Sequence, residues 1–189
     1  DDIMWAYNQQ AQYLVKQEKF EESFRIYEQA LGILSTHLGC LNNYANALLR
    51  LAQIKQNQTL FEKAFQHYEK ALEIKPDHAN NLENYAIALT GLAQIKQDHM
   101  LFAKAFEYYK KALHLEPNET YNLACYYGVL GNADLCPKYL LHAENHNTLP
   151  LRHYQHLTED RDLDSVRHEE WFIELLKRLE AKQQNNEVI

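Results

Sequence analysis

Apolar and small residues recur along this chain with a period of 41 residues. Within a period, Leu82, Tyr85, Ala86 and Leu89 lie three or four positions apart, the spacing of one face of a helix. The positions that repeat at this step are Ala11, Ala52 and Ala93; Phe20, Phe61 and Phe102; Tyr27, Tyr68 and Tyr109; Ala30, Ala71 and Ala112; Ile33, Ile74 and Leu115. Repetition at this spacing predicts a stacked array of helices.

Each period predicts two helices. In the second full period, the apolar pattern predicts a first helix at roughly 79–97 and a second at roughly 101–115. The small residues Ala86 and Ala105 allow the two helices to approach closely, and Pro117 stops the second helix before the next unit begins.

A period near 41 fits HEAT-type arrays as well as stretched tetratricopeptide repeats, so the residues inside the period must decide. The second half of one unit reads Ala64, Tyr68, Ala71 and Pro76, and the next unit repeats it with Ala105, Tyr109, Ala112 and Pro117. Together with the opening pattern from Leu82 to Leu89, these residues resemble the tetratricopeptide repeat (TPR) family. The resemblance implies an all-α fold, a right-handed superhelix of antiparallel helix pairs with a C-terminal helical cap.

The spacing inside the unit departs from the family's 34-residue repeat. Ala86 and Ala105 are 19 residues apart, whereas the corresponding small residues of the family are 12 apart. The surplus of seven residues is about two helical turns, so we expect it to lengthen the first helix without rotating its face. Ala124 and Cys136 are 12 apart, and the last unit therefore lacks the insertion.

The repeat positions divide the chain into an array and a cap. The array covers residues 1–147, with units at about 1–35, 38–76, 79–117 and 118–147. Residues 148–189 carry a helical apolar face at Trp171, Phe172 and Leu175 and end in a polar tail, and we expect them to cover the last repeat. Because residue 1 is Asp rather than Met, the chain can be a piece of a longer protein.

Composition narrows the class of partner. The net charge is −7 and no basic stripe is present, so nucleic acid is not an expected partner. No apolar run approaches the roughly 18 residues of a membrane helix, so membrane insertion is not expected. Three cysteines without metal or redox spacing favour a reducing cytoplasm.

Two clusters invite a chemical interpretation. The histidines His142, His146, His153 and His156 lie close together in sequence, but no carboxylate or cysteine at a recognisable spacing completes a metal site, so surface histidines are favoured while metal binding stays open. The acids Asp160, Asp162 and Asp164 resemble half of a calcium loop whose remaining ligands are missing. We therefore expect no catalytic residues, no metal and no cofactor, and predict that the protein is not an enzyme.

The family resemblance implies a partner peptide bound along the concave surface of the first helices. Residues at i, i+4 and i+7 beside the packing stripe predict a groove rich in amide and apolar groups. The candidate peptide-binding residues are Trp5, Asn42, Asn43, Asn46, Leu49, Gln53, Glu83, Asn84, Ile87, Thr90, Gln94, Tyr121 and Asn122.

Three of these form an aligned row, Asn43, Asn84 and Asn122. Amide side chains offer a donor and an acceptor, so the row can pair with the backbone of an extended peptide, or it can bond between neighbouring helices. Some TPR proteins bind the C-terminal carboxylate of heat-shock chaperones with paired Lys and Arg side chains. Such paired cations are missing from the stripe, so we expect the ligand to be a neutral or apolar segment instead. The leading hypothesis is a protein-binding scaffold, and the alternative is a self-associating assembly module, hence a homo-oligomer.

Overall fold

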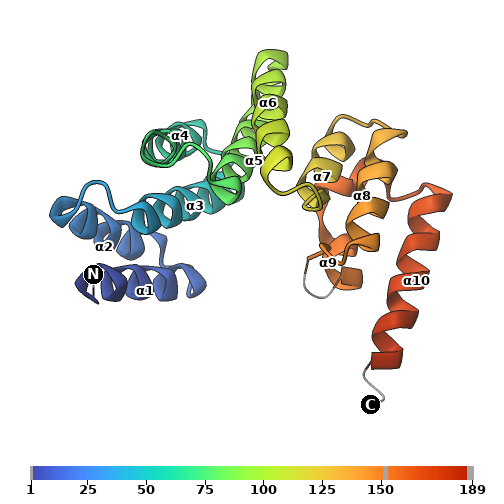
Figure 1. Cartoon of the computed structure of the whole chain (residues 1–189), viewed down its shortest axis with the longest axis horizontal. Helices are drawn as coiled ribbons and strands as arrows, with labels where there is room; N and C mark the ends of the chain where they lie inside the picture. The colour runs from blue at the N-terminus through green and yellow to red at the C-terminus, as the bar shows by residue number, and fades with distance from the viewer. Residues whose placement is uncertain (1, 151–152, 187–189) are drawn as a thin grey trace. The chain divides into compact units, whose positions relative to one another are not determined.

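The computed structural model describes residues 2–150 and 153–186, all of whose ordered elements are helical. Residue 1, residues 151–152 and residues 187–189, which belong to the predicted first unit and cap, lie outside this description. The chain forms two compact units, residues 1–115 and residues 116–189 (Figure 1). The all-α fold expected from the sequence is confirmed.

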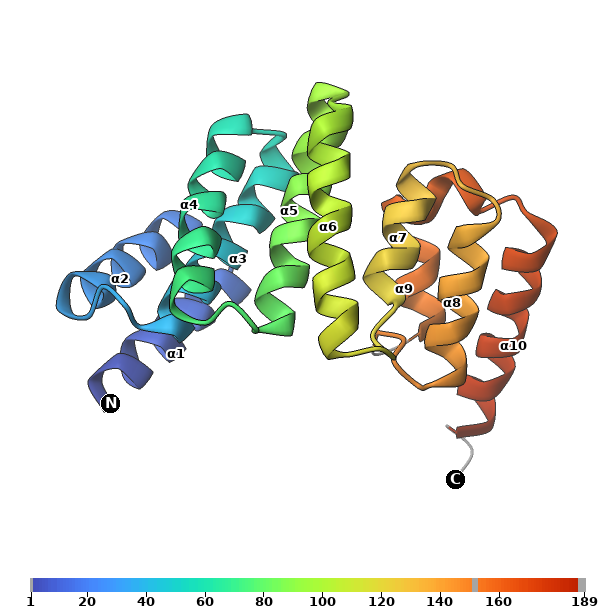
Figure 2. The ribbon, with the colours of Figure 1, turned by 45° about the horizontal axis from the view of Figure 1, so that its top comes forward.

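The first unit consists of three helix pairs. Each pair is a helical hairpin, and successive first helices pack side by side, α1 on α3 and α3 on α5 (Figure 2). The elements are α1 (Asp2–Lys16), α2 (Phe20–Ile33), α3 (Leu38–Lys55), α4 (Gln58–Ile74), α5 (Ala79–Lys96) and α6 (His99–Leu115).

The hairpin turns of the second and third pairs use the same chemistry. Gln56 and Gln97 end α3 and α5 in the left-handed region, with φ of 50° and 53°. The next helix then starts on a polar cap: the Asn57 side chain accepts a hydrogen bond from the amide of Leu60 at 3.2 Å. Asp98 caps α6 through the amide of Met100 at 2.8 Å. The same turn therefore recurs 41 residues later, and in both copies a side-chain oxygen accepts a hydrogen bond from a backbone amide at the start of the next helix.

The seven extra residues lengthen both helices of a pair, not the first helix alone. In the short last pair, the first helix ends at Val129 and the second begins at Leu135, one residue before Cys136. In the long pair, α5 continues to Lys96 and α6 begins at His99, six residues before Ala105. Lengthening both sides of the turn keeps each added segment packed against the other, whereas extending one helix would leave its end uncovered.

Tyrosine pairs join successive hairpins in the first unit. The rings of Tyr27 and Tyr44 stack at 5.3 Å between α2 and α3, and those of Tyr68 and Tyr85 at 5.8 Å between α4 and α5. The Tyr44 hydroxyl donates to Glu28 at 2.9 Å. Burial, followed by this carboxylate, raises the pKa of Tyr44. These pairs repeat one packing layer along the unit.

The second unit combines the last short helix pair with the C-terminal segment. Its elements are α7 (Tyr121–Val129), α8 (Leu135–Asn145), α9 (His153–Glu159), the 3-10 helix η1 (Arg161–Val166) and α10 (Glu170–Asn186). The predicted boundary at 147/148 therefore falls inside this unit, because α7 packs directly on η1.

Two contacts hold this unit together. Gly128 of α7 lies against η1 so closely that a Cβ atom there would stand 2.5 Å from the carbonyl oxygen of Asp162. At the far side of α8, the carboxylate of Glu144 accepts hydrogen bonds from Arg178 and Lys182 of α10, each at 2.9 Å. Burial alone would raise the pKa of Glu144, but these two cations lower it. The predicted cap thus packs on the last helix pair.

Candidate partner-binding surface

A pocket of about 260 Å³ opens between α1 and α3, and we call it the α1–α3 pocket. Its floor includes Tyr27 of α2, which is buried. Two of the predicted peptide-binding residues, Asn43 and Asn46, line it together. The complete lining is Gln12, Val15, Lys16, Tyr27, Asn43, Asn46, Ala47 and Arg50. The register of the repeats therefore locates part of a real concavity.

Hydrogen bonds fix the orientation of the two asparagines. The Asn43 amide nitrogen donates to Oδ1 of Asn8 at 2.9 Å, which leaves Oδ1 of Asn43 as an acceptor. The Tyr68 hydroxyl donates to Oδ1 of Asn46 at 2.6 Å, which leaves the Asn46 amide nitrogen as a donor. The pocket therefore presents one acceptor and one donor on adjacent turns of α3, the pair of groups that a peptide backbone can satisfy.

One end of the pocket is cationic, which the sequence did not predict. Arg50 lies 3.2 Å from the Glu18 carboxylate and 5.7 Å from the centre of the Phe20 ring, and Lys16 is exposed beside it. The predicted stripe on α3 consists of Asn42, Asn43, Asn46, Leu49 and Gln53 and does not include Arg50. Arg50 lies seven residues after Asn43, two helical turns along the same face of α3, so helical periodicity places it in the pocket.

The third first helix, α5, continues the predicted stripe. Asn84 and Ile87 are half-buried, and Gln94 is exposed, as is Gln53 on α3. Within the described part of the chain, the Asn84 side chain has no hydrogen-bond partner, in contrast to Asn43. Asn84 can therefore serve a ligand, while Asn43 bonds between neighbouring helices and keeps one free acceptor.

Several predicted residues lie in the packed interior rather than on a surface. Leu49 is 7% exposed, and Thr90 is 4% exposed with its hydroxyl donating to the carbonyl of Ala86 at 2.9 Å. Tyr121, in the second unit, is 7% exposed and donates to Asp160 at 2.5 Å. These three side chains offer a ligand little surface, which narrows the candidate set.

The remaining predicted residues divide by exposure. Asn42, Glu83 and Asn122 are half-buried, whereas Trp5 is 65% exposed. Oδ1 of Asn42 is buried with no hydrogen-bond partner among the described residues. Asn122 lies on α7 and therefore belongs to the second unit. The first-unit candidates whose side chains a ligand can reach are Asn43, Asn46, Asn84, Ile87, Gln53 and Gln94.

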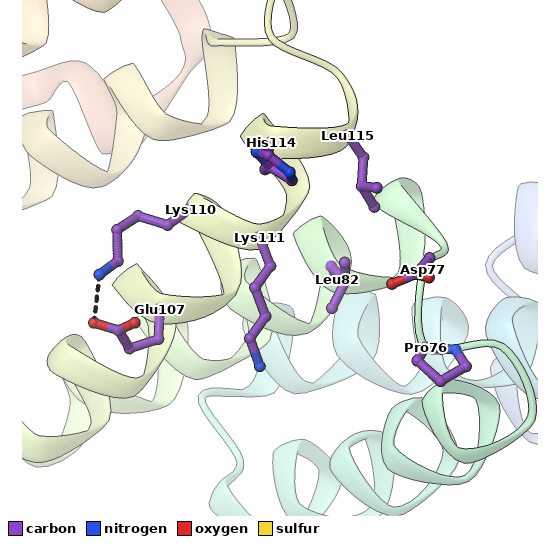
Figure 3. Close-up of a pocket in the computed structure, with 8 residues that line it drawn as sticks. All are labelled: Pro76, Asp77, Leu82, Glu107, Lys110, Lys111, His114 and Leu115. Atoms are coloured by element: carbon purple, nitrogen blue, oxygen red, sulfur yellow. Dashed lines mark ion pairs between the residues drawn. The ribbon is translucent and has the colours of Figure 1, made fainter.

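A larger pocket of about 360 Å³ lies elsewhere in the first unit, over the turn between α4 and α5 and the last turns of α6 (Figure 3). None of the predicted residues lines it. Its acidic and basic groups nearly balance, and Lys110 is already paired with Glu107 at 2.7 Å. The lining is Pro76, Asp77, Leu82, Glu107, Lys110, Lys111, His114 and Leu115. Because its acidic and basic side chains offset one another, this open pocket does not favour a ligand of either charge.

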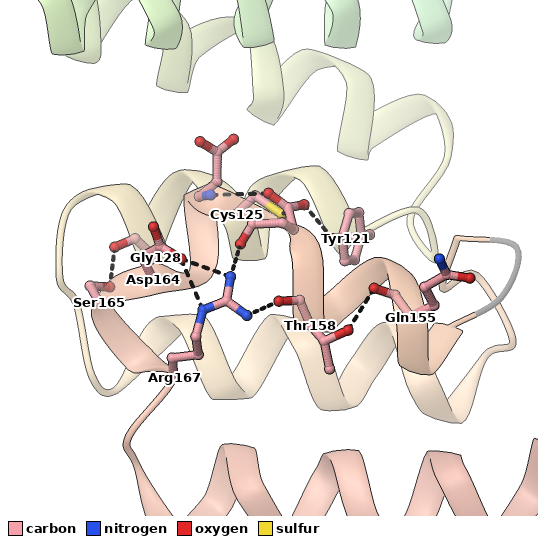
Figure 4. Close-up of polar contacts among 10 residues, drawn as sticks. Tyr121, Cys125, Gly128, Gln155, Thr158, Asp164, Ser165 and Arg167 are labelled. Atoms are coloured by element: carbon pink, nitrogen blue, oxygen red, sulfur yellow. Dashed lines mark hydrogen bonds and ion pairs between the residues drawn. The ribbon is translucent and has the colours of Figure 1, made fainter.

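The acidic segment of the second unit is a structural network (Figure 4). Asp160 accepts from the Tyr121 hydroxyl, and its second oxygen accepts from the amide of Asp162 at 3.0 Å, capping η1. The Arg167 guanidinium donates to the carbonyl of Asp160 at 2.8 Å and to that of Thr158. The residue that caps η1 is therefore Asp160.

The thiol beside this network is not an activated nucleophile. Sγ of Cys125 lies 3.6 Å from Asp160, and burial, followed by this carboxylate, raises the pKa of the thiol well above its usual value. Burial likewise raises the pKa of Cys136, to about 12. Both thiols therefore stay protonated at neutral pH.

The predicted histidine cluster does not gather into a ligand set. The rings of His142 and His146 stack at 4.1 Å, and Nδ1 of His146 lies 2.9 Å from the carbonyl of His142. Across residues 2–150 and 153–186, no three His, Cys, Asp or Glu side chains are placed to hold one metal ion. No helix in these same ranges is long and apolar enough to cross a membrane.

Comparison with known families supports the repeat interpretation. The family model described as tetratricopeptide repeat matches residues 2–77 and again residues 43–116. The two matches together cover the helix pairs of the first unit and confirm the resemblance. No curated protein sequence gives a significant match.

Proposed function

Because the chain belongs to the tetratricopeptide repeat family, whose repeats generally mediate protein–protein interaction, we propose that it is a non-enzymatic adaptor for a partner protein. The binding surface is the first-helix face of residues 2–115, defined by Gln12, Asn43, Asn46, Asn84 and Ile87. An extended segment of the partner occupies this face and runs across α1, α3 and α5.

The observation that carries the proposal is the α1–α3 pocket with its oriented amides. The acceptor of Asn43 and the donor of Asn46 are separated by one helical turn, and the intramolecular bonds to Asn8 and Tyr68 hold both amides in place. Groups already oriented lose little conformational entropy when a ligand binds. A peptide backbone supplies both complementary groups at every residue, whatever its sequence.

Side-chain selectivity then comes from the neighbouring positions. Ile87 offers an apolar contact on α5, and Asn84 beside it supplies an uncommitted amide. The ligand that fits this part of the face is a neutral segment with an apolar anchor. We place this interaction in the cytoplasm, because the free thiols of Cys40, Cys125 and Cys136 suit a reducing compartment.

The test compares wild type with the double variant Asn84→Ala/Ile87→Glu. Peptides selected on the wild-type protein from a random library, and proteins retained from a cell extract, are titrated against both by fluorescence anisotropy. The charge at Ile87 and the missing amide are expected to weaken binding at least tenfold, since a buried charge without a partner is unfavourable.

Ile74→Glu is the matched control. Ile74 is 43% exposed on the second helix α4, so the same substitution there changes net charge equally without touching the first-helix face. Ligands that bind wild type and Ile74→Glu alike, but lose affinity for the double variant, support the proposal. If every specific ligand retains full affinity for the double variant, the first-helix face is not the binding surface.

A further inference from the structure

Two exposed aromatic side chains distinguish α1. Among the Phe, Tyr and Trp residues of the described chain, Trp5 and Tyr13 are exposed, at 65% and 64%, while the others are buried or half-buried. Both lie on the same helix. Exposed aromatic residues that gather on one element are typical of interaction surfaces.

Five exposed residues of α1 form a narrow line along the helix, which we call the α1 strip. Its members are Asp2, Trp5, Gln9, Tyr13 and Lys16. At 100° per residue they fall within about 80° of the helix circumference. The buried residues Met4 and Ala11 lie on the opposite face of α1, the helix that packs on α2 and α3.

The α1 strip is complementary to itself. Gln9 is at its centre, Trp5 and Tyr13 lie four residues to either side, and Asp2 and Lys16 lie seven residues to either side. When a second copy of the strip runs in the opposite direction, each Trp5 meets a Tyr13. Each Asp2 then meets a Lys16, and the two Gln9 side chains meet at the axis, where one amide can donate to the other.

Charge and helix dipole favour the same antiparallel arrangement. The acidic end of the strip is at the N-terminus of α1 and the basic end is at its C-terminus, so a parallel pair would place like charges together. An antiparallel pair instead sets opposite charges and opposite dipole ends side by side. Only the antiparallel register satisfies all five positions.

The equivalent positions of the other first helices lack this pattern, so the strip is not a feature that the repeat imposes. Adding 41 or 82 to the strip positions gives residues that include no aromatic side chain and no glutamine at the position of Gln9. For α3 these are Asn43, Asn46, Arg50 and Ile54, followed by Asn57 just after the helix. For α5 they are Asn84, Ile87, Gly91 and Ile95, followed by Asp98 just after the helix.

We propose that two copies of this chain associate through their α1 helices, packed antiparallel about a two-fold axis at Gln9. Trp5 and Tyr13 form the apolar contacts of this isologous interface, and Asp2 and Lys16 fix its direction. The partner is a second copy of the chain, and it contacts the α1 part of the first-helix face, whereas Asn43, Asn46, Asn84 and Ile87 lie on α3 and α5.

Sedimentation equilibrium of the full chain tests the proposal from about 1 to 500 µM, a range chosen because an interface of one helix pair is small and hence weak. Wild type is expected to show a reversible monomer–dimer equilibrium. Trp5→Glu/Tyr13→Glu is expected to raise the dimer dissociation constant at least tenfold, with an unchanged helical circular dichroism spectrum.

Ile54→Glu is the matched control, because Ile54 lies 41 residues after Tyr13 and is 59% exposed. It should dimerise like wild type. A wild-type protein that stays monomeric throughout the range overturns the proposal. So does a dimer that survives Trp5→Glu/Tyr13→Glu unchanged.

A charge exchange tests the direction of packing. Asp2→Lys and Lys16→Asp each place like charges together in the antiparallel dimer and should weaken it several-fold at low salt. The double variant Asp2→Lys/Lys16→Asp restores opposite pairing and should recover the wild-type constant. Failure of the double variant to recover rules out the antiparallel register. Asn84→Ala/Ile87→Glu should dimerise normally, which separates this interface on α1 from the α5 part of the first-helix face.

Discussion

Replacing Asp162 by asparagine should stabilise the second unit at neutral pH. Burial of this side chain, together with the nearby carboxylates of Asp160 and Asp164, raises its pKa from 3.8 to about 6. At pH 7.5 the native protein therefore holds an ionised carboxylate where a neutral group is preferred. A pKa difference of this size corresponds to about 3 kcal/mol, and Asp162→Asn should recover about 1 to 3 kcal/mol of it.

The sign of the pH dependence follows from the raised pKa. The folded state binds the proton more tightly than the unfolded state, so the protonated Asp162 stabilises the fold fully below pH 3.8. This contribution is lost as pH rises through about 6. The advantage of Asp162→Asn should thus be largest above pH 7 and should disappear near pH 4.

Urea unfolding followed by tryptophan fluorescence measures this effect. The chain has two tryptophans, and a Trp5→Phe background leaves Trp171 of α10 as the reporter for the second unit. Asp164→Asn is the control: its side chain is 63% exposed and pairs with Arg167 at 2.7 Å, so the lost ion pair offsets the relieved repulsion of Asp162, and the gain at pH 7.5 should be smaller than that of Asp162→Asn. An Asp162→Asn gain that is absent at pH 7.5, or equal at pH 4 and pH 7.5, would refute the reasoning.

Four further substitutions probe packing and charge. Gly128→Ala forces a Cβ atom against a backbone carbonyl and should destabilise the second unit by about 1 to 3 kcal/mol in the same urea assay, whereas Gly32→Ala, with open space around it, should stabilise α2 slightly. Glu144→Gln weakens the hydrogen bonds of two cations and should cost about 1 to 3 kcal/mol at pH 7. Because the pKa of Glu144 is lowered, this difference should shrink as pH falls below 4.5. Burial lowers the pKa of His67, so thermal unfolding of the first unit should show stability falling as pH drops below 6.5, and His67→Phe should reduce that dependence.

The helix pairs could be predicted because their signal is local. Apolar residues three or four positions apart define each helix, and the prolines and small residues place the ends and the close contacts. The predicted first helix at 79–97 compares with α5 at Ala79–Lys96, and the second at 101–115 with α6 at His99–Leu115. The earlier start of α6 reflects Asp98, whose side chain caps the helix.

Two histidines cap helices, and their regular spacing in the sequence could have predicted this role. Nδ1 of His37 accepts from the amide of Cys40 at 3.1 Å, and Nδ1 of His78 accepts from that of Asn81 at 3.2 Å. The two histidines are 41 residues apart and directly precede α3 and α5. A repeated polar residue at a predicted helix start indicates a cap, even though histidine is not a common one.

The candidate surface was harder to predict because the burial of a side chain depends on how neighbouring helices pack. The predicted stripe includes Asn43 and Asn46, which line the α1–α3 pocket, but also Leu49 and Thr90, which are buried. It leaves out Arg50, which lies two helical turns after Asn43 on the same face of α3 and lines the pocket. Helical periodicity specifies angles around one axis, whereas burial and pocket shape depend on the distance between axes.

Trp5 shows how one residue separates the two proposed interactions. Its place in the repeat, 41 residues before Asn46, assigned it to the peptide groove, but its exposure and its spacing from Tyr13 place it on the α1 strip. The α1–α3 pocket is lined on α1 by Gln12, Val15 and Lys16, so the pocket and the α1 strip share Lys16 but not Trp5. A Trp5→Glu variant should therefore lose self-association while peptides selected on the first-helix face retain their affinity. Loss of both together would mean that dimerisation builds the peptide site, so that partner binding and assembly are linked through α1.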